Sequence, residues 1–161
     1  MTIQKPVLIG VISDTHGLLR PEAVDALRGS DHIIHGGDVG AHGILDKLRD
    51  IAPLTAVRGN IDKGDWAGEL PETDVLESDG ILIYVLHDLQ QLDLKPTGAG
   101  LAVVVSGHSH VPKQHMRDGV LYFNAGSAGP RRFKLPVSIG KLIVERGVVR
   151  GELLQLRVPG S

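Results

Sequence analysis

The sequence has no cysteine in its 161 residues, which excludes disulfide bonds and thiolate metal sites. Aromatic residues make up only 3% of the chain, so few rings are present for stacking on nucleic-acid bases. Positive charge is not in excess either, because 17 lysines and arginines stand against 19 aspartates and glutamates. We therefore expect no stable nucleic-acid binding, and any bound metal must be held by oxygen and nitrogen atoms.

Long hydrophobic runs and targeting signals are also missing. The apolar runs at 7–12 and 101–105 are far too short to cross a membrane, and the first residues, MTIQKPVLIG, lack the features of a signal peptide. We expect no membrane association and a cytoplasmic location. A hydrophobic share of 42% and a charged share of 22% are typical of a globular protein. The length is typical of one domain, which we expect to span residues 1–161.

The first sixty residues alternate between strand and helix patterns. Nearly continuous apolar runs predict strands over 7–13, 32–35 and 54–58. Pro21 opens a predicted helix between the first two strands, and apolar residues near 44–49 predict a second helix. Strands that alternate with helices in this way form a parallel sheet with right-handed crossovers.

From about residue 73 the pattern changes to hairpins. In each of them an Asp-Gly or Arg-Gly pair separates two β-rich runs, and the predicted hairpins span 75–86, 114–123 and 137–154. Residues 101–105 predict a further strand. Proline and glycine interrupt 88–100, so this stretch predicts a loop with at most one helical turn. The expected fold class is α/β, with a sandwich of two sheets.

Polar residues that can bind metals follow the predicted strands. In an open α/β sheet the carboxyl ends of the strands form one rim, where ligands bind. His108 and His110 would project to the same side of this rim if the strand geometry persisted. One such pair is often only a loop feature, but similar settings recur after several strands. The donors on the rim suffice for two metals and are Asp14, His16, Asp38, Asn60, His87, His108 and His110.

The order of these motifs resembles that of the calcineurin-like metallophosphoesterases, in particular their small bacterial and archaeal phosphodiesterase branch. The resemblance extends from residue 7 to about residue 145. It implies a four-layer αββα sandwich of two mixed β-sheets flanked by helices. The motifs that carry it are SDTHG at 13–17, GGDVG at 36–40, RGNID at 58–62, the single His87, GHSH at 107–110 and NAGSAGPRR at 124–132.

The resemblance also implies a ligand set for two divalent metal ions. It assigns Asp14, His16 and His110 to the first ion and Asn60, His87 and His108 to the second, with Asp38 as the bridge. The residues expected to be catalytic are Asp14, Asp38, Asn60 and His87. Oxygen and nitrogen donors without sulfur suit Mn²⁺ best, with Mg²⁺, Fe, Ni²⁺ or Zn²⁺ as alternatives.

The implied chemistry is hydrolysis of a small phosphoester. Two metals about 3.5–4 Å apart can share a water, lower its pKa and clamp the attacking and leaving oxygens of an in-line displacement. We therefore expect a phosphodiesterase in which a metal-bridging hydroxide attacks phosphorus. One alternative is a phosphomonoesterase. The other is a non-catalytic metal-binding scaffold for protein interactions, as in the retromer's metallophosphoesterase-like subunit. The natural substrate, the metal used and a homo-oligomeric state stay open.

Three positions depart from the family pattern. Ile61 stands where larger family members carry a histidine that is proposed to protonate the leaving group, so diesters are favoured over unactivated monoesters. Asp88 follows His87 where many relatives have glycine, and it either orients the His87 ring or lies in a turn. Ala125 replaces the usual proline of the N-P-G-S motif, which removes a restraint on φ.

Other basic residues are weaker candidates. Arg58 and Arg131 are candidates for binding substrate because a guanidinium group matches phosphate oxygens. His42 lies near the predicted rim and is a candidate to reach the substrate. His35 precedes the GGDVG motif and is a candidate for supporting the metal ligands. His115 is expected to be a surface or strand residue without such a role.

Overall fold

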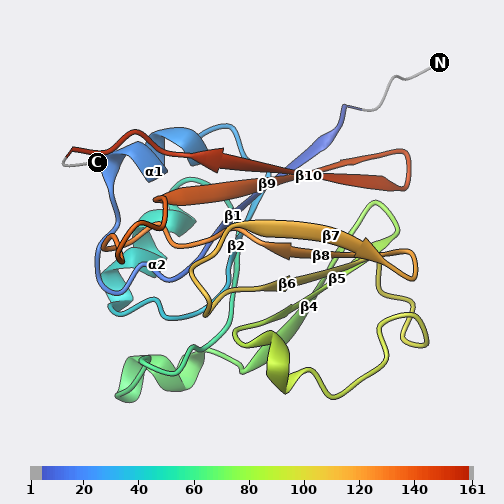
Figure 1. Ribbon diagram of the computed structural model, residues 1–161, viewed down its shortest axis with the longest axis horizontal. Coiled ribbons are helices and arrows are strands. Elements are labelled where there is room, and N and C mark those ends of the chain that lie inside the picture. Colours follow the sequence, from blue (N-terminus) through green and yellow to red (C-terminus); the bar gives the residue numbers. More distant parts are fainter. Residues whose placement is uncertain (1–4, 160–161) are drawn as a thin grey trace.

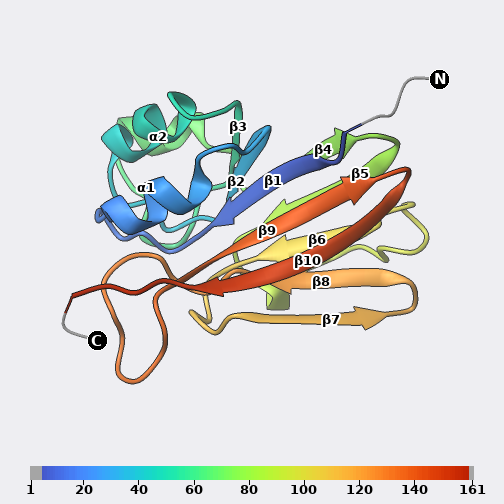
Figure 2. The same ribbon diagram turned by 90° about the horizontal axis from the view of Figure 1, so that it is seen from above.

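Two five-stranded β-sheets pack face to face in the computed structural model, which describes residues 5–159 (Figures 1 and 2). The strand order is β10-β9-β1-β2-β3 in the first sheet and β4-β5-β6-β8-β7 in the second. The strands of the first sheet are β1 (Val7–Ile12), β2 (His32–His35), β3 (Leu54–Ala56), β9 (Ser138–Glu145) and β10 (Val148–Gln155). Those of the second are β4 (Thr73–Ser78), β5 (Ile81–Leu86), β6 (Val103–Ser106), β7 (Lys113–Arg117) and β8 (Val120–Asn124).

The first sheet is parallel where helices connect its strands. Helix α1 (Pro21–Leu27) links β1 to β2, and α2 (His42–Arg49) links β2 to β3. Both helices lie over the outer face of this sheet (Figure 2), where Leu27, Ile33 and Leu45 are fully buried in one cluster. The strands and helices predicted for this region are therefore confirmed, and α1 begins at the predicted proline.

The three predicted hairpins are present as the antiparallel pairs β4 with β5, β7 with β8, and β9 with β10. Their turn dipeptides have positive φ at both residues, as a type I′ turn requires. The values are 48° and 79° at Asp79-Gly80, 51° and 77° at Asp118-Gly119, and 52° and 74° at Arg146-Gly147. The turn chemistry read from the sequence therefore determines where each hairpin reverses.

The second sheet is mixed. Strands β5, β6 and β8 run parallel in its middle, and β4 and β7 pair antiparallel at its two edges. Its inner face contributes Ile83, Val105 and Phe123 to the main core, where they meet Ile9 and Val11 of the first sheet. Apolar contact between the two sheets thus fixes how their strand ends lie relative to each other.

The outer face of the second sheet is covered by the segment 88–100, whose regular structure is limited to a 3₁₀ helix, η2 (Leu89–Gln91). Leu92 and Leu94 of this segment pack against a small cluster that includes Tyr84. The expected α/β sandwich of two mixed sheets is confirmed, but within residues 5–159 the α-helices flank the first sheet only. A second 3₁₀ helix, η1 (Asp65–Glu69), follows β3.

The strand ends of both sheets meet at one end of the sandwich. β1 of the first sheet and β6 of the second point toward this end (Figure 2). The predicted rim therefore draws on both sheets and not on one alone. In residues 5–159, none of the helices combines the length and the apolar character that a membrane crossing requires.

Candidate metal centre

The seven predicted donors gather where the two sheets meet. Six of them form two groups. In each group, the atoms that could bind a metal lie no more than 4.8 Å from one another. The first group contains Asp14, His16 and His110, and the second contains Asp38, His87 and His108. Asn60 joins the second group, because its Oδ1 lies 3.0 Å from His87 Nε2 and 3.3 Å from His108 Nδ1.

Asp14 uses its two carboxylate oxygens differently. Oδ2 accepts hydrogen bonds from Ser13 Oγ at 2.6 Å and from the backbone N–H of His108 at 3.1 Å. Oδ1 is buried without a hydrogen-bond partner and lies 3.4 Å from His110 Nε2 and 3.8 Å from His16 Nε2. His16 Nε2 is likewise buried and unpartnered. Orphaned buried polar atoms are costly, and a cation among these three residues would satisfy them.

Asp38 lies between the two groups. Its Oδ1 accepts the backbone N–H of Ile61 at 3.0 Å, which leaves Oδ2 facing His16 Nε2 at 3.4 Å and His87 Nε2 at 3.3 Å. Burial acts to raise the pKa of Asp38, but the hydrogen bonds from His87 and from the Ile61 N–H outweigh it and hold this pKa below its ordinary value. The carboxylate is therefore ionised and suited to bridge two cations.

His87 and Asn60 define the second group. The Gly36 carbonyl accepts from His87 Nδ1 at 2.8 Å, so Nε2 is the nitrogen that is left to bind a proton or a metal. Burial acts to lower the pKa of His87, but its bonds to Asp38 and to the Gly36 carbonyl raise it overall. Rotating the Asn60 amide would turn its nitrogen toward His87 Nε2 and Asp38. An inward-facing Oδ1 is instead the arrangement that a cation explains.

The backbone of the site is strained. Five of the seven donors have positive φ, a region that costs a non-glycine residue about 1–3 kcal/mol and that occurs often at functional sites. They are Asp14 (55°), His16 (48°), Asp38 (56°), His108 (70°) and His110 (64°). The expectation that His108 and His110 share one side through strand geometry is wrong, because β6 ends at Ser106 and these two residues turn into different groups.

Glycine allows the loops that carry the second group of donors to approach closely. Gly37 has a φ of 100°, and a Cβ there would lie 2.6 Å from His87 Nδ1. A Cβ on Gly59 would overlap the backbone and carboxylate of Asp38. A side chain at Gly37 would push the Asp38 loop away from His87, and one at Gly59 would push it away from the Asn60 loop, so either would disrupt the second group.

His35 supports the site from behind, as the sequence suggested. Its Nδ1 accepts the backbone N–H of Gly37 at 3.1 Å, and its Nε2 lies 3.0 Å from Thr15 Oγ1. Complete burial, partly offset by the nearby carboxylates, lowers its pKa from 6.5 to about 4. A neutral His35 therefore links the loops that follow β1 and β2.

Asp62 is a supporting residue to which the sequence pattern assigned no role. Its carboxylate, in a residue that is only 4% exposed, accepts backbone N–H groups from Val39 at 3.2 Å, Gly40 at 2.9 Å and Gly59 at 2.9 Å. It thus ties the Asp38 loop to the Asn60 loop. The only available signal was its place two residues after Asn60 in the RGNID motif.

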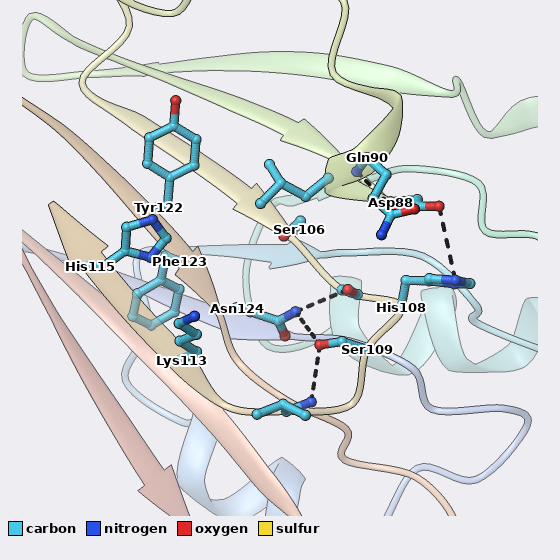
Figure 3. A pocket seen from close by; sticks show the side chains of 13 residues that line it. Asp88, Gln90, Ser106, His108, Ser109, Lys113, His115, Tyr122, Phe123 and Asn124 are labelled. Atoms are coloured by element: carbon cyan, nitrogen blue, oxygen red, sulfur yellow. Dashed lines mark hydrogen bonds and ion pairs between the residues drawn. The ribbon is translucent and has the colours of Figure 1, made fainter. Parts of the chain in front are cut away.

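Asp88 faces His108 and does not orient His87. Its Oδ1 accepts the backbone N–H of Gln90 at 3.0 Å at the start of η2, and its Oδ2 lies 3.9 Å from His108 Nε2 (Figure 3). The role of orienting His87 belongs to the Gly36 carbonyl. Of the two sequence hypotheses for Asp88, the structure favours the turn.

The three candidate substrate residues lie in different settings. Arg58 lines a cavity next to Asn60 and pairs with Glu72 at 3.1 Å. His42 is the first residue of α2 and pairs with Asp46 at 3.3 Å on the helix surface. Arg131 is exposed in the segment between β8 and β9. Only Arg58 among them lines a cavity that also contains metal-ligand candidates.

The chemistry of the donor set fits two divalent metal ions. Carboxylate, imidazole and amide donors without sulfur are typical ligands of Mn²⁺ and related ions, and the orphaned atoms lie where cations would bind. Clusters of Asp and His side chains at the strand ends of an α/β sandwich point to the class of metal-dependent hydrolases.

Comparison with known proteins places the chain within this class. Residues 7–147 match the family model for the calcineurin-like phosphoesterase superfamily domain, and the chain belongs to this superfamily. A probable metallophosphoesterase of Methanocaldococcus jannaschii is 41% identical over 152 residues, which cover 86% of this chain and 77% of that protein. The resemblance inferred from the motifs is therefore confirmed.

Solved structures share the fold at low sequence identity. One described as a novel archaeal phosphodiesterase has a TM-score of 0.75 at 23% identity and covers 92% of this chain and 100% of its own. Vacuolar Protein Sorting 29 of Cryptosporidium parvum also has a TM-score of 0.75, at 17% identity, covering 93% of this chain and 97% of its own. The fold alone therefore does not separate a hydrolase from a sorting protein.

Proposed function

We propose that this protein is a phosphodiesterase that hydrolyses a small phosphodiester with two divalent ions, Mn²⁺ by preference. The seven donors would hold these ions, with Asp38 between them. The observation that carries the proposal is the position of Asp38 Oδ2, which lies 3.4 Å from His16 Nε2 and 3.3 Å from His87 Nε2 and so faces both groups.

The chain's own contribution to catalysis is positioning. Two bound ions would acidify a water molecule and neutralise charge on the phosphoryl oxygens. Asp14 and Asp38 each anchor one carboxylate oxygen with protein hydrogen bonds and present the other in a fixed direction. The Gly36 carbonyl fixes the tautomer and the plane of His87. Such supporting bonds commonly decide metal affinity and activity.

Ile61 supports a preference for diesters. Its backbone N–H binds Asp38, and its side chain is 39% exposed at the site. The sec-butyl side chain of isoleucine has no ionisable proton to give to a leaving alcohol, so a poor leaving group receives no help from this position. A diester with a good leaving group depends less on such an acid.

Two cavities offer room for the two substituents of a diester. One of about 560 Å³ is lined by Arg58, Asn60 and His87, and the other, of about 270 Å³, is lined by Ser109. Both also contact His108 and Asp88, so they flank the same edge of the second group. Arg58 stays our candidate for binding substrate, and His42 and Arg131 stay predictions.

The scaffold alternative has a specific observation in its favour, namely the shared fold with Vacuolar Protein Sorting 29. Against it, each of the seven positions in this chain carries a side chain able to bind metal. Turnover, and not metal binding, is what separates the two functions.

The test is hydrolysis of bis(p-nitrophenyl) phosphate and of p-nitrophenyl phosphate by metal-stripped protein, before and after Mn²⁺ is restored. We expect Mn²⁺-dependent turnover that favours the diester. A preference for the monoester would replace the diesterase with a phosphomonoesterase. Bound Mn²⁺ without turnover of either substrate would overturn the hydrolase and favour the scaffold.

A further inference from the structure

A cavity of about 270 Å³ lies on the outer face of the second sheet, beside the second group of donors (Figure 3). The outward-facing side chains of β6 and β8 line it, among them Ser106, Tyr122 and Asn124. His108 and Asp88 stand at one end of the cavity, and His115 stands beside Tyr122 at the other. The cavity therefore leads from a candidate metal ligand to an aromatic wall.

The aromatic wall is preformed. His115 and Tyr122 are register partners on β7 and β8, and their rings are stacked with centroids 5.2 Å apart and planes inclined by 8°. The chain has only two tyrosines and a 3% aromatic share. One of the two, Tyr122, lies half-buried in this cavity. Stacked rings of this kind can extend the stack to a further planar ring.

The rest of the lining is mixed, with Leu89 and Val111 as apolar members and Asn124 as an ordered polar one. Asn124 Nδ2 donates to the Gly107 carbonyl at 2.9 Å and to Ser109 Oγ at 3.1 Å, while its Oδ1 accepts the Gly126 N–H at 2.9 Å. Lys113 pairs with Asn124 across the strands and adds a positive charge at the exposed rim. The lining also contains the Asp88 carboxylate, so the cavity combines stacking and polar groups without an excess of positive charge, which suits an uncharged planar ring.

The size of the cavity restricts what it can hold. Sites that take a whole drug-sized ligand measure about 300–1,000 Å³, and 270 Å³ is just below this range. One ring system fits, so the remainder of the ligand must lie outside. The end of the cavity at His108 would place that remainder at the metals.

We propose that this cavity binds the planar heteroaromatic group, such as a nucleobase, of a nucleotide-like phosphoester whose phosphate lies at the metals. This inference rests on the proposed function, because the metals are what would hold the phosphate. His115 then has a binding role that its sequence setting did not indicate.

The test is calorimetric binding of adenosine 5′-monophosphate and ribose 5-phosphate to the Mn²⁺-loaded protein. The two probes share the ribose and the phosphate, and ribose 5-phosphate carries an anomeric hydroxyl in place of the base. We expect the nucleotide to bind about tenfold tighter to the wild-type protein, from stacking on one aromatic pair. Tyr122→Ala should reduce this ratio of affinities, and so should His115→Ala, which changes an exposed residue. Tyr122→Phe should retain the ratio.

Met116→Ala is the matched control, because Met116 follows His115 on β7 and is 64% exposed. Ribose 5-phosphate should bind all variants equally. Equal affinity of the two probes for the wild-type protein, or an unchanged ratio in both alanine variants, would overturn the aromatic subsite and leave the proposed function standing. Failure of both probes to bind would contradict the phosphate site itself, and with it the aromatic subsite that depends on this phosphate site.

Discussion

Asp38 is the residue on which both groups of donors depend. One of its oxygens is held by the Ile61 N–H, and the other faces His16 and His87. We predict that Asp38→Ala loses both metals and lowers turnover by more than about 100-fold, because supporting residues alone are worth about 10–100-fold. Metal analysis and diester assays check this, with the exposed Asp25→Ala as the control. Normal activity in Asp38→Ala would contradict the proposed mechanism.

Asn60 should affect one metal only. Its Oδ1 lies near His87 and His108 of the second group, while the first group stays complete without it. We predict that Asn60→Ala binds one Mn²⁺ per chain where the wild-type protein binds two. Two ions bound at wild-type affinity would show that Asn60 has been assigned wrongly.

His35 gives a pH dependence whose sign follows from its burial. Its pKa is lowered from 6.5 to about 4 in the folded protein. Between these values the unfolded chain takes up a proton that the folded chain does not, so the free energy of unfolding falls as the pH falls through this window. The full effect is about 3 kcal/mol.

Urea unfolding of the metal-free protein at pH 7 and pH 5 measures this effect. His35→Asn removes the titrating ring, and its stability should change less between the two pH values than that of the wild-type protein. Equal pH dependence in the two proteins would mean that folding does not lower the pKa of His35.

At this scale the sequence predicted which side chains gather at the candidate centre, but it predicted poorly what supports them. The candidate ligands stand in short motifs at strand ends, so their chemistry can be read locally. The bonds from Val39 and Gly40 to Asp62, and the contact between Asp88 and His108, join loops about twenty residues apart in the chain. Such contacts depend on packing that no local pattern encodes.

At the scale of elements, the loops after β2 and β3 act as one unit because Asp62 joins them. Its carboxylate accepts three backbone N–H groups. We predict that Asp62→Ala destabilises the fold by about 3 kcal/mol, because buried donors lose a charged acceptor, and weakens Mn²⁺ binding about 10–100-fold. Denaturant titration and metal binding are the measurements, with exposed Asp74→Ala as the control. If Asp62→Ala bound Mn²⁺ with wild-type affinity, the metal centre would not depend on the Asp62 hydrogen bonds between the two loops.

The hairpins were predictable as elements because their turns are chemically explicit, with Asp-Gly or Arg-Gly at positive φ. Over the second sheet, the loop with at most one helical turn that the sequence predicted for 88–100 is confirmed. The family resemblance implied helices there, whereas the segment 88–100 is interrupted by Pro96, Gly98 and Gly100 and forms only η2 within the described chain. The proline and glycines of this segment therefore prevent the helices that the family resemblance implied.

At the scale of the whole molecule, the metal centre depends on how two sheets are joined. β9, from the last part of the chain, pairs with β1, which is the strand that leads to Asp14. No periodicity in the sequence indicates this order of strands, because pairing partners are chosen by tertiary packing. The sequence thus predicted the sandwich but not the order in which its strands pair.

The most direct test of the two-metal centre is anomalous X-ray diffraction from crystals loaded with Mn²⁺. We predict two peaks about 3.5–4 Å apart, one among Asp14, His16 and His110 and the other among Asn60, His87 and His108, with Asp38 contacting both. A single peak, or two peaks that Asp38 does not bridge, would contradict the two-metal centre.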